Sequence, residues 1–405
     1  MTMASTWTSQ GKTGTDNPSL NYYRTHGILP GRQQLAIRES HVEMRSSLFR
    51  HLGLPPGWLR GRTVLELGPG CGQNALHMFL QKPARLLLVD ENEAALEAIR
   101  NLFAAHRNSN QPDCELQHGL IEAWRCPDQF ELVFCESVIP WQQENPQGFL
   151  RKVASHVAPE GLLIITCMDS VSTLPDLLRR LATLLMVRPE DPLARQVTLL
   201  SGYFREHLAS LQHATKQIDD WVLTNLLQPL VGTPLSMADA IATLDDNFDL
   251  YATSPHFVTD WRWYKQIHGS LSRWNELALA AFWNQAHNLL DCRQVVPPRS
   301  AALNQQLMQQ TDRMAADIMK FYHSRDPALL PGLADTLDWV VSDVNGFAPL
   351  TAVALAEFAR GLGQYRQHGR FPGLPVFKDL FGRSQQHLCF IQRRSHTHDT
   401  TKDAW

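Results

Sequence analysis

The 405-residue sequence predicts an α/β protein built on a doubly wound, mostly parallel sheet. Between positions 63 and 167, short apolar runs alternate with helix-compatible segments, which is typical of parallel strands joined by right-handed crossovers. A glycine cluster follows the first apolar run, and two further strand candidates occur much later, at 247–255 and 386–392. The long stretches between these late strands have helical spacing, so we expect large α-helical insertions in the sheet.

Composition and charge argue against several classes of function. The chain is 44 % hydrophobic and long enough for two or three domain-sized units. Its net charge of −3 offers no basic field to nucleic acid or to an anionic membrane. No run of about 18 apolar residues occurs, so we expect neither a signal peptide nor a membrane span. Seven cysteines without a C-x-x-C pair fit a reducing cytoplasm.

The first predicted strand runs into a glycine turn at residues 63–75, TVLELGPGCGQNA. Gly68, Gly70 and Gly72 can adopt positive φ and let the backbone approach a ligand closely. The helix behind them offers free N–H groups. The spacing differs from the G-x-G-x-x-G fingerprint of dinucleotide sites. Because the carboxylate of Glu66 would repel a pyrophosphate, the turn suits a nucleotide that carries a cation.

Residues 66–72, ELGPGCG, resemble the first motif of class I S-adenosylmethionine-dependent methyltransferases, E/D-x-G-x-G-x-G. The resemblance extends over about residues 52–166. For the motif alone, the alternative is a glycine turn that serves only the geometry of the fold. The resemblance implies a Rossmann-like fold of seven strands with an antiparallel closing strand. It also implies an enzyme whose cofactor is S-adenosylmethionine.

The second predicted strand, residues 85–90 with the sequence RLLLVD, ends in an acid. A carboxylate at this place can accept two hydrogen bonds from a ribose diol. The resemblance assigns that role to Asp90, and Glu91 could share it. The alternative is that Asp90 caps the helix predicted over 93–103, because Asp is a good N-cap residue.

The third predicted strand, residues 114–118, precedes the segment that flanks the adenine in the resembled family. Ile121 and Glu122 match the apolar and polar positions beside the adenine. Leu120 stands where the family usually has an acid, so the sequence departs there from the family pattern.

The fourth predicted strand covers residues 130–137, and its carboxyl end faces the transferred methyl group in the resembled fold. We expect Glu136 to contact the cofactor or to accept a proton, and a solvated rim carboxylate is the alternative. Family members that methylate amide or base nitrogens carry Asn/Asp-Pro-Pro-aromatic here, whereas this chain has ESVI. This departure argues against nucleic acid as the acceptor.

The strands, with a fifth predicted over 162–167, divide the chain into a core and its insertions. We expect a disordered tail at 1–20, a cofactor-binding core with an N-terminal helix at 21–170, a helical insertion at 171–245, a core strand at 246–256, a helical cap at 257–382, a closing strand at 383–394 and a disordered tail at 395–405. In the resembled family such N-terminal segments fold over the cofactor, which would bring Tyr22, Tyr23 and His41 toward it. Half-buried packing is the alternative for each of the three.

The segment 254–264, SPHFVTDWRWY, holds the densest set of candidate acceptor-binding residues. His256 and Asp260 share one face if the segment is helical, and either could take the proton of a hydroxyl acceptor. Aromatic faces for a sugar or an apolar acceptor come from Trp261, Trp263 and Tyr264. The alternative is an aromatic anchor for the cap with a capping Asp.

These features favour methyl transfer to a small acceptor, such as a sugar or another hydroxylated metabolite. A large cap can bury a compact acceptor, and acceptance of a sugar is implied by similarity to bacterial methyltransferases that modify small metabolites or saccharides. The alternatives are a protein methyltransferase and a non-catalytic module that binds the cofactor or keeps only its fold. Histidines without ligand spacing predict no metal site. The accepting atom and the oligomeric state do not follow from the sequence.

Overall fold

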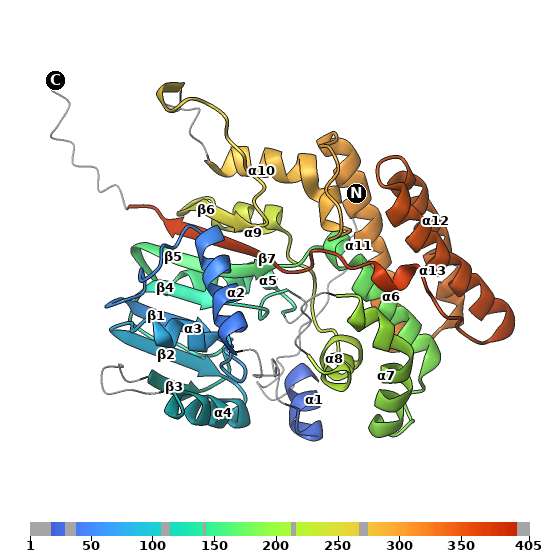
Figure 1. Cartoon of the computed structure of the whole chain (residues 1–405), viewed down its shortest axis with the longest axis horizontal. Coiled ribbons are helices and arrows are strands. Elements are labelled where there is room, and N and C mark those ends of the chain that lie inside the picture. The colour runs from blue at the N-terminus through green and yellow to red at the C-terminus, as the bar shows by residue number, and fades with distance from the viewer. Residues whose placement is uncertain are drawn as a thin grey trace, which may run out of the picture.

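A computed structural model describes residues 18–28, 38–106, 114–140, 143–211, 216–266 and 274–394. Its strands form one seven-stranded sheet in the order β3-β2-β1-β4-β5-β7-β6 (Figure 1). The strands are β1 (Thr63–Leu67), β2 (Arg85–Asp90), β3 (Cys114–His118), β4 (Phe130–Cys135), β5 (Val157–Cys167), β6 (Phe248–Ser254) and β7 (Gln386–Gln392).

Strands β1 to β5 pair in parallel, whereas β7 runs antiparallel between β5 and β6. The predicted doubly wound, Rossmann-like sheet with an antiparallel closing strand is therefore confirmed. The C-terminal strand, β7, lies next to β5, so β6 is the edge strand on that side of the sheet. The fifth strand, predicted over 162–167, begins earlier, at Val157, and residues 158–161 form a bulge in it, where Glu160 has a φ of 61°.

Five helices belong to the first part of the chain: α1 (Pro18–His26), α2 (Arg38–His51), α3 (Ala75–Leu80), α4 (Glu93–Ala104) and α5 (Pro146–Ala154). The start of α1 at Pro18 corrects the prediction of a disordered tail through residue 20. The rest of the predicted N-terminal tail, residues 1–17, lies outside the described residues. The same holds for residues 33–37, where we expect the N-terminal helix to begin, and for the predicted tail at 395–405.

Two helical insertions interrupt the sheet. Between β5 and β6 lie α6 (Ser170–Met186), α7 (Leu193–Ala209), α8 (Ile218–Trp221), the π-helix η2 (Val222–Leu227) and α9 (Met237–Leu244). Between β6 and β7 lie α10 (Trp274–Gln285), α11 (Ala301–Ser324), α12 (Leu330–Asn345) and α13 (Pro349–His368), with short 3₁₀ turns at η3 (Tyr264–Gln266), η5 (Ala286–Leu289), η6 (Pro327–Leu329) and η7 (Phe377–Asp379). Figure 1 shows α6, α7, α11, α12 and α13 gathered on one side of the sheet.

The two insertions, which together are called the cap below, share a continuous apolar core with one face of the sheet. Leu65 and Val133 of the sheet belong to the same cluster of buried side chains as Phe204 of α7 and Leu337 of α12. Val64, which points to the other face as a neighbouring strand residue must, packs in a second cluster with Phe49 and Leu96. The insertions are thus built into the domain, because their apolar faces are buried against the strands. No described helix is long and apolar enough to cross a membrane.

Candidate cofactor and acceptor site

The turn after β1 needs its glycines. Gly68, Gly70 and Gly72 have φ values of 74°, 55° and 78°, in the left-handed region that glycine adopts without strain. A Cβ at Gly68 would lie 2.4 Å from Val138 Cγ2, and one at Gly72 would lie 2.6 Å from Ile99 Cγ1. The backbone of the loop is therefore packed between the segment after β4 and α4, and any side chain at these two positions would displace it.

Asp90 closes this loop from the end of β2. Its Oδ2 accepts a hydrogen bond of 3.0 Å from the N–H of Gly70, and its Oδ1 accepts one of 2.8 Å from the N–H of Asn92. Burial raises the pKa of Asp90 to about 6. The N-cap of α4 is Asn92, whose side chain accepts from the N–H of Ala94. The alternative that Asp90 caps this helix is therefore wrong, and Asp90 instead lies at the glycine turn.

Glu91 connects the end of β2 with the segment after β3. Its Oε1 accepts a hydrogen bond of 2.9 Å from the N–H of Ile121, while its carbonyl accepts from Arg24 of α1. Burial raises the pKa of this carboxyl. Ile121 is buried, whereas the side chain of Glu122 is exposed. The structure thus brings Glu91 and Ile121 together near Asp90 and leaves Glu122 in solvent.

Glu66 is a buried carboxyl without a full set of partners. It is 2 % exposed, and its Oε2 has no hydrogen-bond partner among the described residues. Burial, together with the charge of Glu136, raises the pKa of Glu66 to about 8. The group is therefore protonated at neutral pH, and a cation placed beside it would favour its ionised form.

Glu136 is held from three elements. Its Oε1 accepts from Nη1 of Arg45 at 3.0 Å and from Nε2 of His387 at 2.9 Å, and its Oε2 accepts from Nδ2 of Asn74 at 3.0 Å. Burial alone would raise the pKa of Glu136, but the charge of Arg45 and the hydrogen bond from His387 bring it well below its usual range. The alternative that Glu136 is a solvated carboxylate at the rim of the sheet is therefore wrong. Glu136 is a largely buried anion, already hydrogen-bonded through both oxygens, that orients its neighbours.

Arg45 is the residue that sequence reasoning missed. It is 4 % exposed, and its Nε and Nη2 have no hydrogen-bond partner within the described part of the chain. The signal was present, since Arg45 falls on the apolar stripe of Val42, Phe49 and Leu52 at spacings of three and four residues. An arginine on such a stripe is buried with it and needs anionic partners. Burial and the charge of Arg45 lower the pKa of nearby His41.

These unpaired atoms fit the amino-acid end of S-adenosylmethionine. An α-carboxylate would satisfy the free N–H groups of Arg45, and an α-ammonium would satisfy Glu66 and favour its ionised form. The loop at Gly70 and the carboxylate of Asp90 provide an edge for the adenosyl part. The residues present therefore suit the cofactor that the motif implies.

Tyr22 and Tyr23 lie in α1, which packs against the cap. The hydroxyl of Tyr22 donates to the carbonyl of Leu223 in η2 at 3.2 Å, and burial raises the pKa of Tyr22 to about 12. Burial also raises the pKa of Tyr23. The contact of Tyr22 with the cap supports the packing alternative for that residue, while Arg24 in the same helix reaches the end of β2.

The segment after β6 differs from the expectation. Residues 255–263 are irregular, so His256 and Asp260 do not share a helix face. The carboxylate of Asp260 is paired with its neighbour Arg262 at 2.7 Å. Trp261 is 92 % exposed, and Trp263 and Tyr264 are exposed as well. Side chains this exposed form no wall of an enclosed site.

His256 opens on a groove of about 500 Å³ beside the end of β4. The imidazoles of His256 and of His51 from α2 are stacked with their centroids 4.8 Å apart. The groove is lined by His51, Ser254, Pro255, His256, Gly382, Arg383, Ser384 and Gln385. Because Nε2 of Gln385 donates to the hydroxyl of Ser137 at 3.0 Å, the groove adjoins the strand end that carries Glu136.

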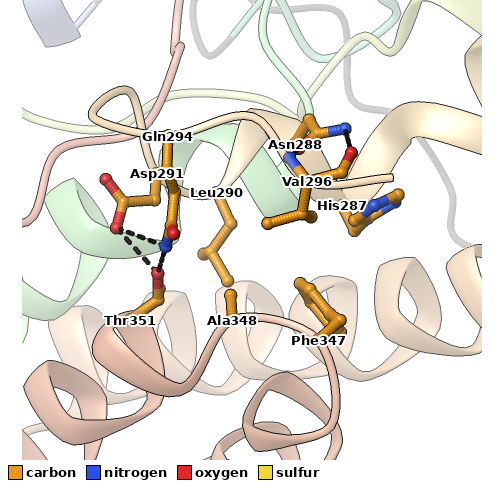
Figure 2. Close-up of a pocket in the computed structure, with 9 residues that line it drawn as sticks. All are labelled: His287, Asn288, Leu290, Asp291, Gln294, Val296, Phe347, Ala348 and Thr351. Carbon is orange, nitrogen blue, oxygen red and sulfur yellow. Dashed lines mark hydrogen bonds between the residues drawn. The ribbon is translucent and has the colours of Figure 1, made fainter. Parts of the chain in front are cut away.

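A second cavity lies in the cap and is too small for a substrate. It has a volume of about 10 Å³ between η5 and the junction of α12 and α13. Figure 2 shows the hydrogen bonds at its side, where Thr351 Oγ1 lies 2.7 Å from Asp291 Oδ2 and Gln294 joins both. A space of this size holds at most a water molecule. No group of three His, Cys, Asp or Glu side chains that could hold a metal occurs in the described residues.

The chain matches one known domain family. Residues 64–161 match the family model of the methyltransferase domain. No curated protein matches the chain significantly. The match includes the glycine loop, Asp90, Ile121 and Glu136.

Many solved structures resemble parts of the chain. The CcbJ methyltransferase from Streptomyces caelestis is 20 % identical over 32 % of this chain and 50 % of its own, with a TM-score of 0.27. PKMT2 from Rickettsia typhi in complex with AdoHcy is 16 % identical over 56 % of this chain and 46 % of its own, with a TM-score of 0.38. Coclaurine N-methyltransferase is 12 % identical over 90 % of this chain and 75 % of its own, with a TM-score of 0.37.

The matches to the first two structures span only about half of those proteins. The family assignment therefore rests on the motif, on the sheet order and on the domain match. Residues 64–161 belong to the class I methyltransferase domain family, whose cofactor is S-adenosylmethionine.

Proposed function

We propose that this protein transfers a methyl group from S-adenosylmethionine to a small hydroxylated acceptor, such as a sugar. The observation that carries the proposal is the pair of unsatisfied buried groups, Arg45 and Glu66, beside a glycine loop that Asp90 closes. Such groups are costly to bury without a ligand. An amino acid joined to an adenosyl group matches their charges and their place at the sheet edge. With seven free cysteines, we place the protein in the reducing cytoplasm.

Bound S-adenosylmethionine supplies a methyl carbon activated by its sulfonium. The protein's task is to hold the cofactor and to align the accepting atom behind that carbon. Arg45 and Glu66 would hold the amino-acid end, and Asp90 the ribose. Glu136 would fix Arg45 and His387 in place, since it is ionised and both of its oxygens already accept hydrogen bonds.

The groove beside Ser137 is the acceptor site in this proposal. Its volume of about 500 Å³ is within the range of small-molecule sites. Among the three side chains predicted as catalytic, Asp260 is paired with Arg262 and Glu136 accepts hydrogen bonds through both oxygens, and only His256 lines the groove. A protein acceptor is the second candidate, because the groove is open to solvent and could admit a side chain.

Calorimetry with S-adenosylmethionine tests the proposal. We expect the unmodified protein to bind it, and Asp90→Asn to bind at least about tenfold more weakly, because the amide cannot accept two hydrogen bonds from a diol while it also holds Gly70. Asp335→Asn, on the exposed face of α12, is the matched control. Absence of binding by the unmodified protein would sink the proposal and leave a non-catalytic module. Transfer of labelled methyl to sugars, amines or peptides would then separate the acceptor classes.

A further inference from the structure

The lining of the acceptor groove combines one permanent positive charge, that of Arg383, with two imidazoles. The imidazoles belong to His51 and His256, and the lining contains no acid. Hydrogen-bonding groups are added by Ser254, Ser384 and Gln385. A cleft lined by one sign of charge concentrates ligands of the opposite sign.

Arg383 brings a charge that forms no ion pair within the described residues, although the carboxyl of Asp291 is close enough to act on it. Its Nη1 donates to the carbonyls of Asn288 and Asp291, and its Nη2 donates to the carbonyls of Cys292 and Gln294. Within the described residues no carboxylate lies within ion-pair distance of its guanidinium. The four carbonyls fix the guanidinium in position and occupy its four Nη hydrogens, so Arg383 acts on the groove through its positive charge.

The two histidines are fixed as well. The stacked rings come from different elements, His51 from the last turn of α2 and His256 from the segment after β6. The backbone beside His256 is held by Thr253, whose hydroxyl donates to the carbonyl of Pro255 and accepts from the N–H of Phe257. A preformed pair of imidazoles presents ring N–H groups without losing side-chain freedom on binding.

The geometry of α2 sets the scale of the distance from these histidines to the cofactor cluster. His51 lies six residues after Arg45, which corresponds to about 9 Å along a helix axis. Arg45 donates to Glu136, at the strand end where the methyl carbon is expected. The two side chains leave the helix about 120° apart, so the rise sets only the scale of the separation between the histidines and the cofactor cluster.

We propose that the outer end of the groove binds an oxyanion of the acceptor, a phosphate or a carboxylate, through His51, His256 and Arg383. The inference rests on the proposed function for the statement that the anion belongs to a methyl acceptor. The accepting atom then lies at the inner end beside Ser137, and His256 helps to position the acceptor there.

Binding of simple anions tests the inference. Inorganic phosphate, acetate, glucose 6-phosphate and glucose are titrated into the full chain with S-adenosylmethionine present, at constant ionic strength. We expect glucose 6-phosphate to bind more tightly than phosphate, and glucose to bind at least about tenfold more weakly than its phosphate. Tighter binding of acetate than of phosphate would identify the anion as a carboxylate.

The variant H51N/H256N should bind glucose 6-phosphate at least about tenfold more weakly while its affinity for S-adenosylmethionine is unchanged. The control H323N/H368N, with two exposed histidines in α11 and α13, should bind both as the unmodified protein does. If the double variant fails to fold, Ser384→Asp replaces it, because a carboxylate in the lining repels an anion.

Equal anion binding by the groove variants and the unmodified protein, or no binding by the latter, overturns the inference. If the unmodified protein does not bind S-adenosylmethionine, the proposed function is overturned instead. The claim that the anion belongs to a methyl acceptor is then overturned with it.

Discussion

The glycine loop after β1 and the segment 377–385 before β7 reach the same edge of the sheet, but they are held differently. Asp90 closes the loop from 20 residues away in the sequence. The segment 377–385 is held by Arg179, which donates to the carbonyl of Leu380 from 201 residues away, and by Arg383, which reaches back 92 residues to Asp291. The glycine loop is therefore closed by a near neighbour in the sequence, whereas the acceptor side is assembled from distant segments.

This difference predicts that the two sides fail differently. Damage to the loop should abolish cofactor binding with a moderate loss of stability. Damage to the anchors of 377–385 should destabilise the fold, with cofactor contacts affected only indirectly. Four changes test this contrast.

Arg179→Ala should give the largest effect. Arg179 is fully buried, its guanidinium lies 3.7 Å from the ring centroid of Phe381, and it donates to two carbonyls of the segment 377–385. Removing it leaves those carbonyls and Asp176 unpaired, so we expect the free energy of unfolding to fall by about 3–5 kcal/mol. Denaturant titration measures this fall. Exposed Arg195→Ala is the control, and an equal loss in both variants would contradict the anchoring role.

Gly72→Ala should lower stability by about 1–3 kcal/mol, because the residue has a φ of 78° and a Cβ would meet Ile99. It should also abolish S-adenosylmethionine binding in calorimetry. Gly363→Ala in α13 is the matched control, since nothing lies within 4 Å of a Cβ there and alanine favours the helix. Retained cofactor affinity in Gly72→Ala would remove the loop from the site.

Arg45→Met should weaken the binding of S-adenosylmethionine about tenfold or more, which corresponds to a loss of about 1.4 kcal/mol in binding free energy. The methionine fills the space beside the rings of Phe49 and Phe134, over which the guanidinium lies, but it offers no N–H group to a carboxylate. Adenosine, which lacks the amino-acid end, should bind equally to variant and unmodified protein. An equal loss for both ligands would mean that Arg45 only supports the fold.

Glu66→Gln should change how stability depends on pH. The pKa of Glu66 is raised in the folded protein to about 8, so the folded state keeps a proton that the unfolded chain releases above its ordinary value. Stability is then full below that ordinary value and falls as pH rises toward 8, by about 1 kcal/mol per pH unit for one proton. The glutamine variant should show a flatter fall between pH 6.5 and 8, above the raised pKa of Asp90. Parallel slopes in thermal or denaturant unfolding would show that Glu66 is already ionised.

Several parts of the structure followed from local sequence. The run RLLLVD forms β2 with the predicted bounds, and the apolar run before the glycine turn forms β1, because an apolar run between turn residues leaves few other ways to bury itself. Gly68 and Gly72 lie in left-handed backbone, as the motif requires. The bond between Asp90 and Gly70 joins two predicted residues because parallel strands end at the same edge.

Other parts depended on contacts that no local pattern encodes. Helix α1 starts inside a segment predicted as a tail, since its order comes from Tyr22 and Ser19 binding carbonyls of the cap. The segment after β6 has the spacing for a helix, yet it stays irregular, with Asp260 turned to Arg262.

The sequence by itself determined the sheet, the glycine loop and the cofactor class, because each depends on residues close together in the chain or on a periodic apolar pattern. Only the tertiary structure decided that Arg45, His387 and Asn74 meet at Glu136, and that His51 stacks on His256. These groups come from segments up to 251 residues apart. Their meeting follows from how the insertions pack against the sheet, and packing depends on the shape of the whole core.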